Sequence, residues 1–185
     1  HVVAAAPRKR LDPQGAPAMI VQLERTTLLT DESGRSFVGL ASAIDAADPA
    51  RSLRFDPEGL RISPQGDLFV SDEYGPHLFQ FSPQGRLTRR FALPPRFTIA
   101  KPASTEEEEH RLNTIGRQTN RGLEGLAIPD DGRHLYPIMQ GPLLQDHPFD
   151  SEGERLGRNV RLLHFDLDAG STRQLVYQLD EPKHG

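Results

Sequence analysis

The chain has 185 residues, a formal net charge of −4 and 36% hydrophobic residues, enough for one domain of ordinary size with a buried core. The slightly acidic composition does not suggest a nucleic-acid binder, which usually shows a basic face, and no apolar run is long enough to span a membrane. Cysteine is absent, so disulfides, thiolate metal sites and cysteine nucleophiles are excluded.

The N-terminal part of the chain separates from the rest. Residues 1–19 are interpreted as an extension or a truncated edge, and residues 20–30 predict one strand, followed by a turn at 31–34. Proline and glycine number 16 each, which predicts many turns and few long helices.

An internal repeat organises the remaining sequence. In each of two units a Glu-Gly pair is followed by Leu-x-Ile, then by a turn glycine eight residues after the glutamate and by a Gly-Pro step seventeen residues after it. The matching positions are Glu58, Gly66 and Gly75 in the first unit, and Glu124, Gly132 and Gly141 in the second. Agreement at several spaced positions indicates that both units have the same local structure.

Each unit is predicted to contain four short strands, because alternating apolar residues are separated by Pro-x-Gly and Asp-x-Gly turns. The strands with explicit bounds are predicted at 60–62, 67–71, 78–81, 87–93, 160–165 and 174–179. The fold class is therefore all-β, and the predicted architecture is a partial β-propeller of about two four-stranded blades plus an outer strand of a preceding one. The alternative is an ordinary antiparallel sandwich. A propeller needs more blades to close, so the chain is interpreted as a fragment.

Two long segments interrupt this pattern, at 96–121 and at 143–159. Long connections are usually functional or disordered. The acidic run 106–109 predicts one helical turn that is solvated rather than a metal site. His147, beside a carboxylate in the second segment, is a candidate general base or a solvated loop histidine. The histidines lack the helix-face spacing of a zinc site, and His164 is interpreted as a packing or surface residue.

The two Glu-Gly pairs are the main candidates for chemistry. The innermost strands of propeller blades line the central channel, so Glu58 and Glu124 are expected to converge there from neighbouring blades. Converging carboxylates suit a hard cation such as Ca²⁺, and both residues are candidate catalytic and metal-binding groups. The alternative is a structural role, in which each carboxylate caps a turn or pairs with an arginine such as Arg61 or Arg121.

Other polar residues are candidates for the same site. Asp72 and Glu73 follow the second strand of the first unit and are predicted as further metal ligands, with Asp56 and Asn120 as additional candidates. Arg117 and Arg121 are predicted to bind substrate, because guanidinium groups suit phosphate or carboxylate ligands. They are equally able to offset the acidic run before them.

Several segments together resemble one known family, the phytase-like family described as having the "esterase-like activity of phytase". The resembling segments are 55–60, 70–76, 120–127, 139–143 and 158–161. The resemblance covers residues 20–182, leaving 183–185 as a truncated end. It implies a β-propeller domain, usually exported by bacteria, that is periplasmic or secreted and has an esterase-like or phosphatase-like activity. The family domain is about twice as long as this chain.

Two functions from different classes follow from these observations. The first is hydrolysis of a small-molecule ester or phosphoester, with Ca²⁺ as the expected cofactor and with the incomplete chain inactive on its own. The second is a non-catalytic propeller that binds a ligand or a protein partner through its long loops. Neither requires nucleic acid or a membrane span.

Overall fold

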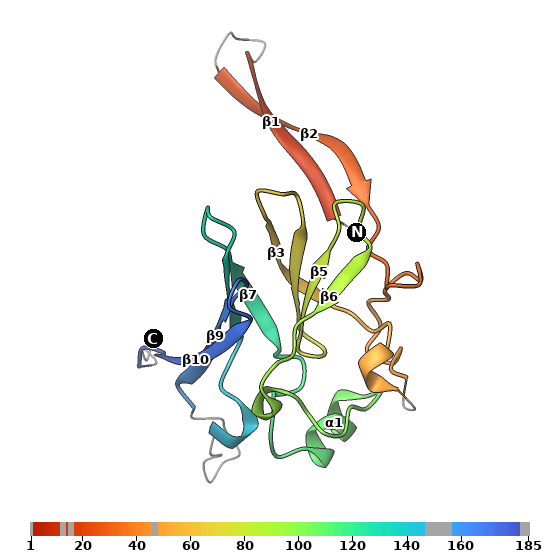
Figure 1. Cartoon of the computed structure of the whole chain (residues 1–185), viewed down its shortest axis with the longest axis vertical. Helices are drawn as coiled ribbons and strands as arrows, with labels where there is room; N and C mark the ends of the chain where they lie inside the picture. The colour runs from red at the N-terminus through yellow and green to blue at the C-terminus, as the bar shows by residue number, and fades with distance from the viewer. Residues whose placement is uncertain (1, 12–13, 15–16, 46–47, 147–156, 182–185) are drawn as a thin grey trace.

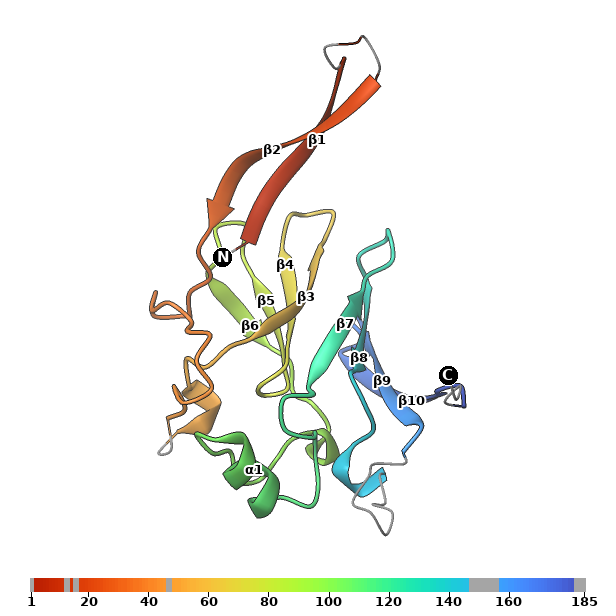
Figure 2. The same ribbon diagram turned by 180° about the vertical axis from the view of Figure 1, so that it is seen from behind.

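The fold is known from a computed structural model, which describes residues 2–11, 14, 17–45, 48–146 and 157–181. In this part of the chain the strands form two four-stranded antiparallel sheets and a two-stranded hairpin (Figures 1 and 2). The all-β prediction is therefore confirmed. The two four-stranded sheets do not close into a ring.

The first four-stranded sheet follows chain order, because each strand turns back directly onto the one before it. Its strands are β3 (Pro57–Ile62), β4 (Leu68–Asp72), β5 (His77–Phe81) and β6 (Leu87–Arg90). The tight turns at its ends use Gly66 and Gly85, which have φ of 91° and 85°. Glycine adopts this left-handed backbone without steric cost, as the Pro-x-Gly pattern predicts.

The second four-stranded sheet is built in the same way, with the order β10-β9-β8-β7. Its strands are β7 (Leu123–Ala127), β8 (His134–Met139), β9 (Asn159–Asp166) and β10 (Ser171–Gln178). The two sequence units thus correspond to two antiparallel meanders of four strands, and the repeat read from the sequence is a structural repeat.

The N-terminal segment forms a hairpin of β1 (Val2–Leu11) and β2 (Pro17–Thr27). It extends away from the two larger sheets (Figure 1). The strand expected at 20–30 is present as β2, but it ends at Thr27 and its partner is β1. Residues 2–11 are thus part of a sheet.

Short helices lie in the connections, and no helix of the described residues has both the length and the apolar character needed to cross a membrane. They are η1 (Pro49–Arg51), η2 (Pro95–Phe97), α1 (Glu106–Leu112) and η3 (Leu144–Asp146). Thr105 caps α1 by accepting a hydrogen bond from the Glu108 backbone N–H. The helical turn predicted for the acidic run is confirmed. The prediction that the whole run is solvated is wrong for Glu109, which is 3% exposed.

Two clusters of buried side chains hold the sheets together. One fills the space between the two four-stranded sheets and combines residues such as Phe69 and Phe91 with Leu123 and Phe165. The other covers the opposite face of the first sheet, where the rings of Phe55 and Phe79 stack at 5.3 Å. This packing brings β3 and β7, the first strands of the two units, next to each other.

Candidate functional site

Glu58 and Glu124 lie in equivalent β-bulges. In the pairing of β3 with β4, Pro57 faces Asp72 and Gly59 faces Ser71, so Glu58 is an extra residue without a partner across the ladder. In the pairing of β7 with β8 the register shifts in the same way between Leu123 and Gly125, and Glu124 is the extra residue. A bulge bends its strand and re-aims the side chain at that position, and bulges are frequent beside active sites.

One glycine beside each glutamate, Gly59 after Glu58 and Gly122 before Glu124, makes room for close contact between the two units. A Cβ at Gly59 would lie 2.8 Å from Leu126 Cβ and 3.1 Å from the backbone oxygen of Glu124. A Cβ at Gly122 would lie 2.1 Å from the backbone oxygen of Glu73. Side chains do not fit at such distances, so the glycines allow the carboxylate-bearing segments to approach each other.

The structure brings four carboxyl groups of these segments together, here named the acidic cluster: Asp56, Glu58, Glu73 and Glu124. One carboxylate oxygen from each of the first three lies within 4.8 Å of the others. Glu124 belongs to the same group because its charge and hydrogen bonding act on both Glu58 and Glu73. Glu58 and Glu124 therefore lie close together in the fold, as the sequence predicts.

Crowding changes the protonation of the acidic cluster. Burial, followed by hydrogen bonding to Glu124 and by repulsion from the other carboxylates, raises the pKa of Glu73 to about 8. Burial and the charges of Glu124 and Asp56 also raise the pKa of Glu58. Carboxyl groups this close hold protons between them at neutral pH or are neutralised by a cation. Strongly shifted carboxyl groups of this kind are typical of functional sites.

Asp72 stabilises the backbone that carries the acidic cluster. It is fully buried, and its two oxygens accept hydrogen bonds from the backbone N–H groups of Asp56 at 2.6 Å and Gly75 at 2.7 Å. The backbone N–H of Glu73 in turn donates to the backbone oxygen of Asp56 at 3.0 Å. Burial raises the pKa of Asp72 to about 7. These bonds fix the backbone that carries two members of the acidic cluster.

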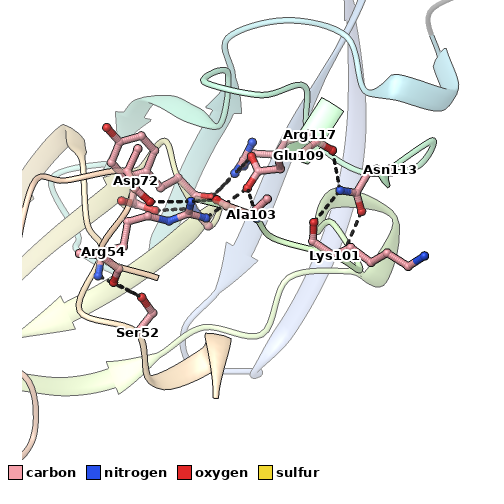
Figure 3. A network of polar contacts seen from close by, with 12 residues as sticks. Ser52, Arg54, Asp72, Lys101, Ala103, Glu109, Asn113 and Arg117 are labelled. Carbon is pink, nitrogen blue, oxygen red and sulfur yellow. Dashed lines mark hydrogen bonds and ion pairs between the residues drawn. The ribbon is translucent and has the colours of Figure 1, made fainter. Parts of the chain in front are cut away.

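Next to this segment lies a buried ionic network of Arg54, Glu109 and Arg117 (Figure 3). Arg117 is 1% exposed, donates from Nε and Nη2 to the backbone oxygen of Tyr74 at 2.8 and 2.5 Å, and pairs with Glu109 at 2.6 Å. Arg54 pairs with the other oxygen of Glu109 at 3.3 Å. The network ties the long connection 96–121 to the residue after Glu73.

The other predicted residues have different surroundings. Arg121 is exposed, whereas the donors of Arg117 are engaged inside the network. Asn120 is exposed and has a φ of 53°. His147 lies outside the described residues. The ion pairs formed by the described residues include neither Glu58 nor Glu124.

Sequence reasoning missed Glu109 and Arg54 as parts of the site's support. Glu109 belongs to a run of four glutamates on a helix of seven residues, and only contact with the sheets distinguishes it from its neighbours. Its partner Arg54 is 55 residues away in the sequence. The sequence marks Asp56 as a secondary candidate, and the structure places one of its oxygens within 4.8 Å of oxygens of Glu58 and Glu73.

Comparison with known proteins identifies the family. A protein of Arthroderma benhamiae described as an "Uncharacterized secreted protein" is 28% identical over 94% of this chain. The chain spans 40% of the length of that relative. The family model "Phytase-like: Esterase-like activity of phytase" matches residues 8–185. With nearly the whole chain matched, and with the residues of both repeat units inside the match, the chain belongs to the phytase-like family.

Proposed function

We propose that the chain is the part of a secreted phytase-like hydrolase that carries its acidic cluster, and that the cluster binds Ca²⁺ during hydrolysis of a phosphate or carboxylic ester. The observation that carries the proposal is the pair of equivalent bulges, which direct Glu58 and Glu124 to one place. Bulges re-aim side chains and are frequent beside active sites, so two bulges at matching positions support a functional role for both glutamates.

The donor set fits a hard cation. Ca²⁺ takes oxygen ligands at about 2.3–2.6 Å, so two oxygens bound to one ion lie at most about 5 Å apart. The oxygens of Asp56, Glu58 and Glu73 are within 4.8 Å of one another. Burial and the neighbouring carboxylates raise the pKa values of Glu58 and Glu73, and the charge of a divalent cation would offset the repulsion between these groups.

The residues of the chain have complementary roles in the proposed reaction. A bound cation supplies electrophilic polarisation of the ester oxygen. Glu58 or Glu124 orients a water molecule and accepts its proton as the water attacks the ester. The exposed guanidinium of Arg121 is available to an anionic substrate. Asp72 and Arg117 hold the backbone around the cluster.

The complete protein is proposed to be a closed β-propeller in which further blades continue the arrangement of the two sheets. The Arthroderma benhamiae relative, of which this chain covers 40%, shows that the region occurs within longer chains. In a closed ring, the first strands of other blades bring additional groups to the same channel, because every blade presents its innermost strand there. Secretion is proposed from the description of the relative.

The experiment is an activity assay of the full-length protein on a chromogenic phosphate ester and a chromogenic carboxylic ester, with and without a chelator. We expect activity on one of them, lost on chelation and restored by Ca²⁺, and lost in the double variant Glu58→Gln, Glu124→Gln. The matched control is Asp130→Asn, an exposed carboxylate in a turn. Full activity of the double variant would refute the catalytic role, and Ca²⁺ binding without activity would favour the non-catalytic binding protein.

A further inference from the structure

Two histidines meet on the second sheet, away from the acidic cluster. His134 begins β8, His164 lies on β9, and His134 Nδ1 is 3.2 Å from His164 Nε2. Both side chains are half-buried. Glu124 lies beside Met139 at the other end of β8, five residues from His134, which corresponds to about 17 Å along a strand. The histidine pair therefore does not share ligands with the acidic cluster.

The distance between the two ring nitrogens matches that in a metal chelate. Imidazole nitrogens bind Zn²⁺ at about 2.0–2.1 Å, so two of them lie about 3.3 Å apart at a tetrahedral angle and about 2.9 Å apart at a right angle. The observed 3.2 Å falls between these values. Binding requires the rings to turn slightly, so that both lone pairs point to one ion beside the line between the nitrogens.

The surroundings restrain one ring and place charged side chains of both signs beside the pair, with Arg173 directly opposite His164 in the ladder. Tyr136 stacks on His164 with ring centroids 4.8 Å apart and planes at 6°, which restrains that imidazole. Asp166 is directly opposite His134 in the ladder, and its Oδ1 accepts the backbone N–H of Ala169 at 2.8 Å. This fixed carboxylate adds negative charge next to the two rings.

We propose that His134 and His164 form a bidentate site for a borderline divalent transition metal, with Zn²⁺ or Cu²⁺ as the ion and solvent completing the coordination. Imidazole ligands suit these ions, whereas Ca²⁺ prefers oxygen. In the neutral pair one ring donates its N–H to the other. On binding, that ring moves its proton to its other nitrogen, so both facing nitrogens offer lone pairs and no net proton is released.

The test is isothermal titration of Zn²⁺ into the full-length protein in saturating Ca²⁺, which occupies oxygen sites. We expect His134→Ala and His164→Ala each to weaken Zn²⁺ binding at least about tenfold, since loss of even an outer-shell partner costs about 10–100-fold. His110→Ala, which removes an exposed histidine of α1, is the matched control and leaves the affinity unchanged.

Electron paramagnetic resonance of the Cu²⁺-loaded wild-type protein decides the question even if the alanine variants fold poorly. Hyperfine splitting from two imidazole nitrogens supports the site. A spectrum with one imidazole or none, or equal Zn²⁺ affinity of the wild-type protein and folded histidine variants, would overturn the proposal. Neither outcome depends on the acidic cluster, so this site stands or falls separately from the proposed hydrolase.

Discussion

Glu58 and Glu124 are the extra residues of two equivalent β-bulges, and they meet where Gly59 packs against the backbone of Glu124. A Cβ at Gly59 would lie 3.1 Å from the Glu124 backbone oxygen. The bulges turn both carboxylates toward the same place, and the glycine lets the two sheets come close enough for them to interact. The acidic cluster is therefore a product of the repeat itself, to which the first unit adds Asp56 and Glu73.

Replacement of Glu124 by glutamine is expected to stabilise the Ca²⁺-free fold and to weaken Ca²⁺ binding. Glu124 raises the pKa of both Glu58 and Glu73, so its loss relieves repulsion and raises the free energy of unfolding without Ca²⁺ by up to about 1 kcal/mol, the scale of partly exposed charge interactions. The same change weakens Ca²⁺ binding. Urea unfolding and calorimetric titration measure the two effects, with Asp130→Asn as control. A variant that is less stable and binds Ca²⁺ unchanged would contradict the prediction.

The stability of the Ca²⁺-free protein is expected to fall as pH rises from about 4.5 to about 8. The pKa of Glu73 is raised from 4.5 to about 8, and that of Asp72 from 3.8 to about 7. In this window the folded protein keeps protons that the unfolded chain has released, so the free energy of unfolding decreases with pH. Denaturant unfolding across the window measures it, and Glu73→Gln reduces the slope. A free energy that rises throughout the window would refute this assignment.

Gly122→Ala is expected to displace the backbone of Glu73. The added Cβ would lie 2.1 Å from the Glu73 oxygen and 2.6 Å from its Cα, and backbone atoms cannot move aside cheaply. Overpacking of this kind costs about 1–3 kcal/mol, and we expect weaker Ca²⁺ binding as well. Thermal unfolding and titration measure both effects. Gly39→Ala, where nothing lies within 4 Å of the added carbon, is the control, and equal behaviour of the two variants would argue against the contact.

Arg117→Met is expected to destabilise the fold strongly. It removes one of the two arginine partners of buried Glu109 and two hydrogen bonds to the Tyr74 backbone oxygen. Breaking a buried ion pair by removing one partner costs about 3–5 kcal/mol. Arg111→Met, an exposed arginine on α1, should stay within about 0.5 kcal/mol of the wild-type protein. If Arg117→Met melts at the wild-type temperature, the network does not secure the long connection.

The strands and turns of the sheets can be predicted well because the signals that specify them lie close together in the sequence. Alternating side chains and turn glycines such as Gly66 and Gly85 mark strands and reversals without knowledge of distant residues. The common spacing after Glu58 and Glu124 also predicts that the two glutamates occupy equivalent positions. The bulges could not be predicted, because a bulge exists only relative to the register of the partner strand.

The contacts that could not be predicted join distant segments. Glu109 resembles the three glutamates before it, and its burial depends on Arg54 and Arg117. The pair of His134 and His164 is likewise 30 residues apart in the sequence. Which side chains are neighbours across β8 and β9 depends on the register of the two strands. The sequence of the connection between these strands has no pattern that specifies the register.

The most direct test of the acidic cluster is a crystal structure of the full-length protein grown with Ca²⁺ at a pH above about 8, where Glu73 is ionised, with the ion located by its anomalous scattering. We predict one anomalous peak bound by carboxylate oxygens of Asp56, Glu58 and Glu73, with Glu124 in contact with the ion or with a water on it. A structure that holds Ca²⁺ elsewhere while these four carboxyl groups remain hydrogen-bonded to one another would contradict the account.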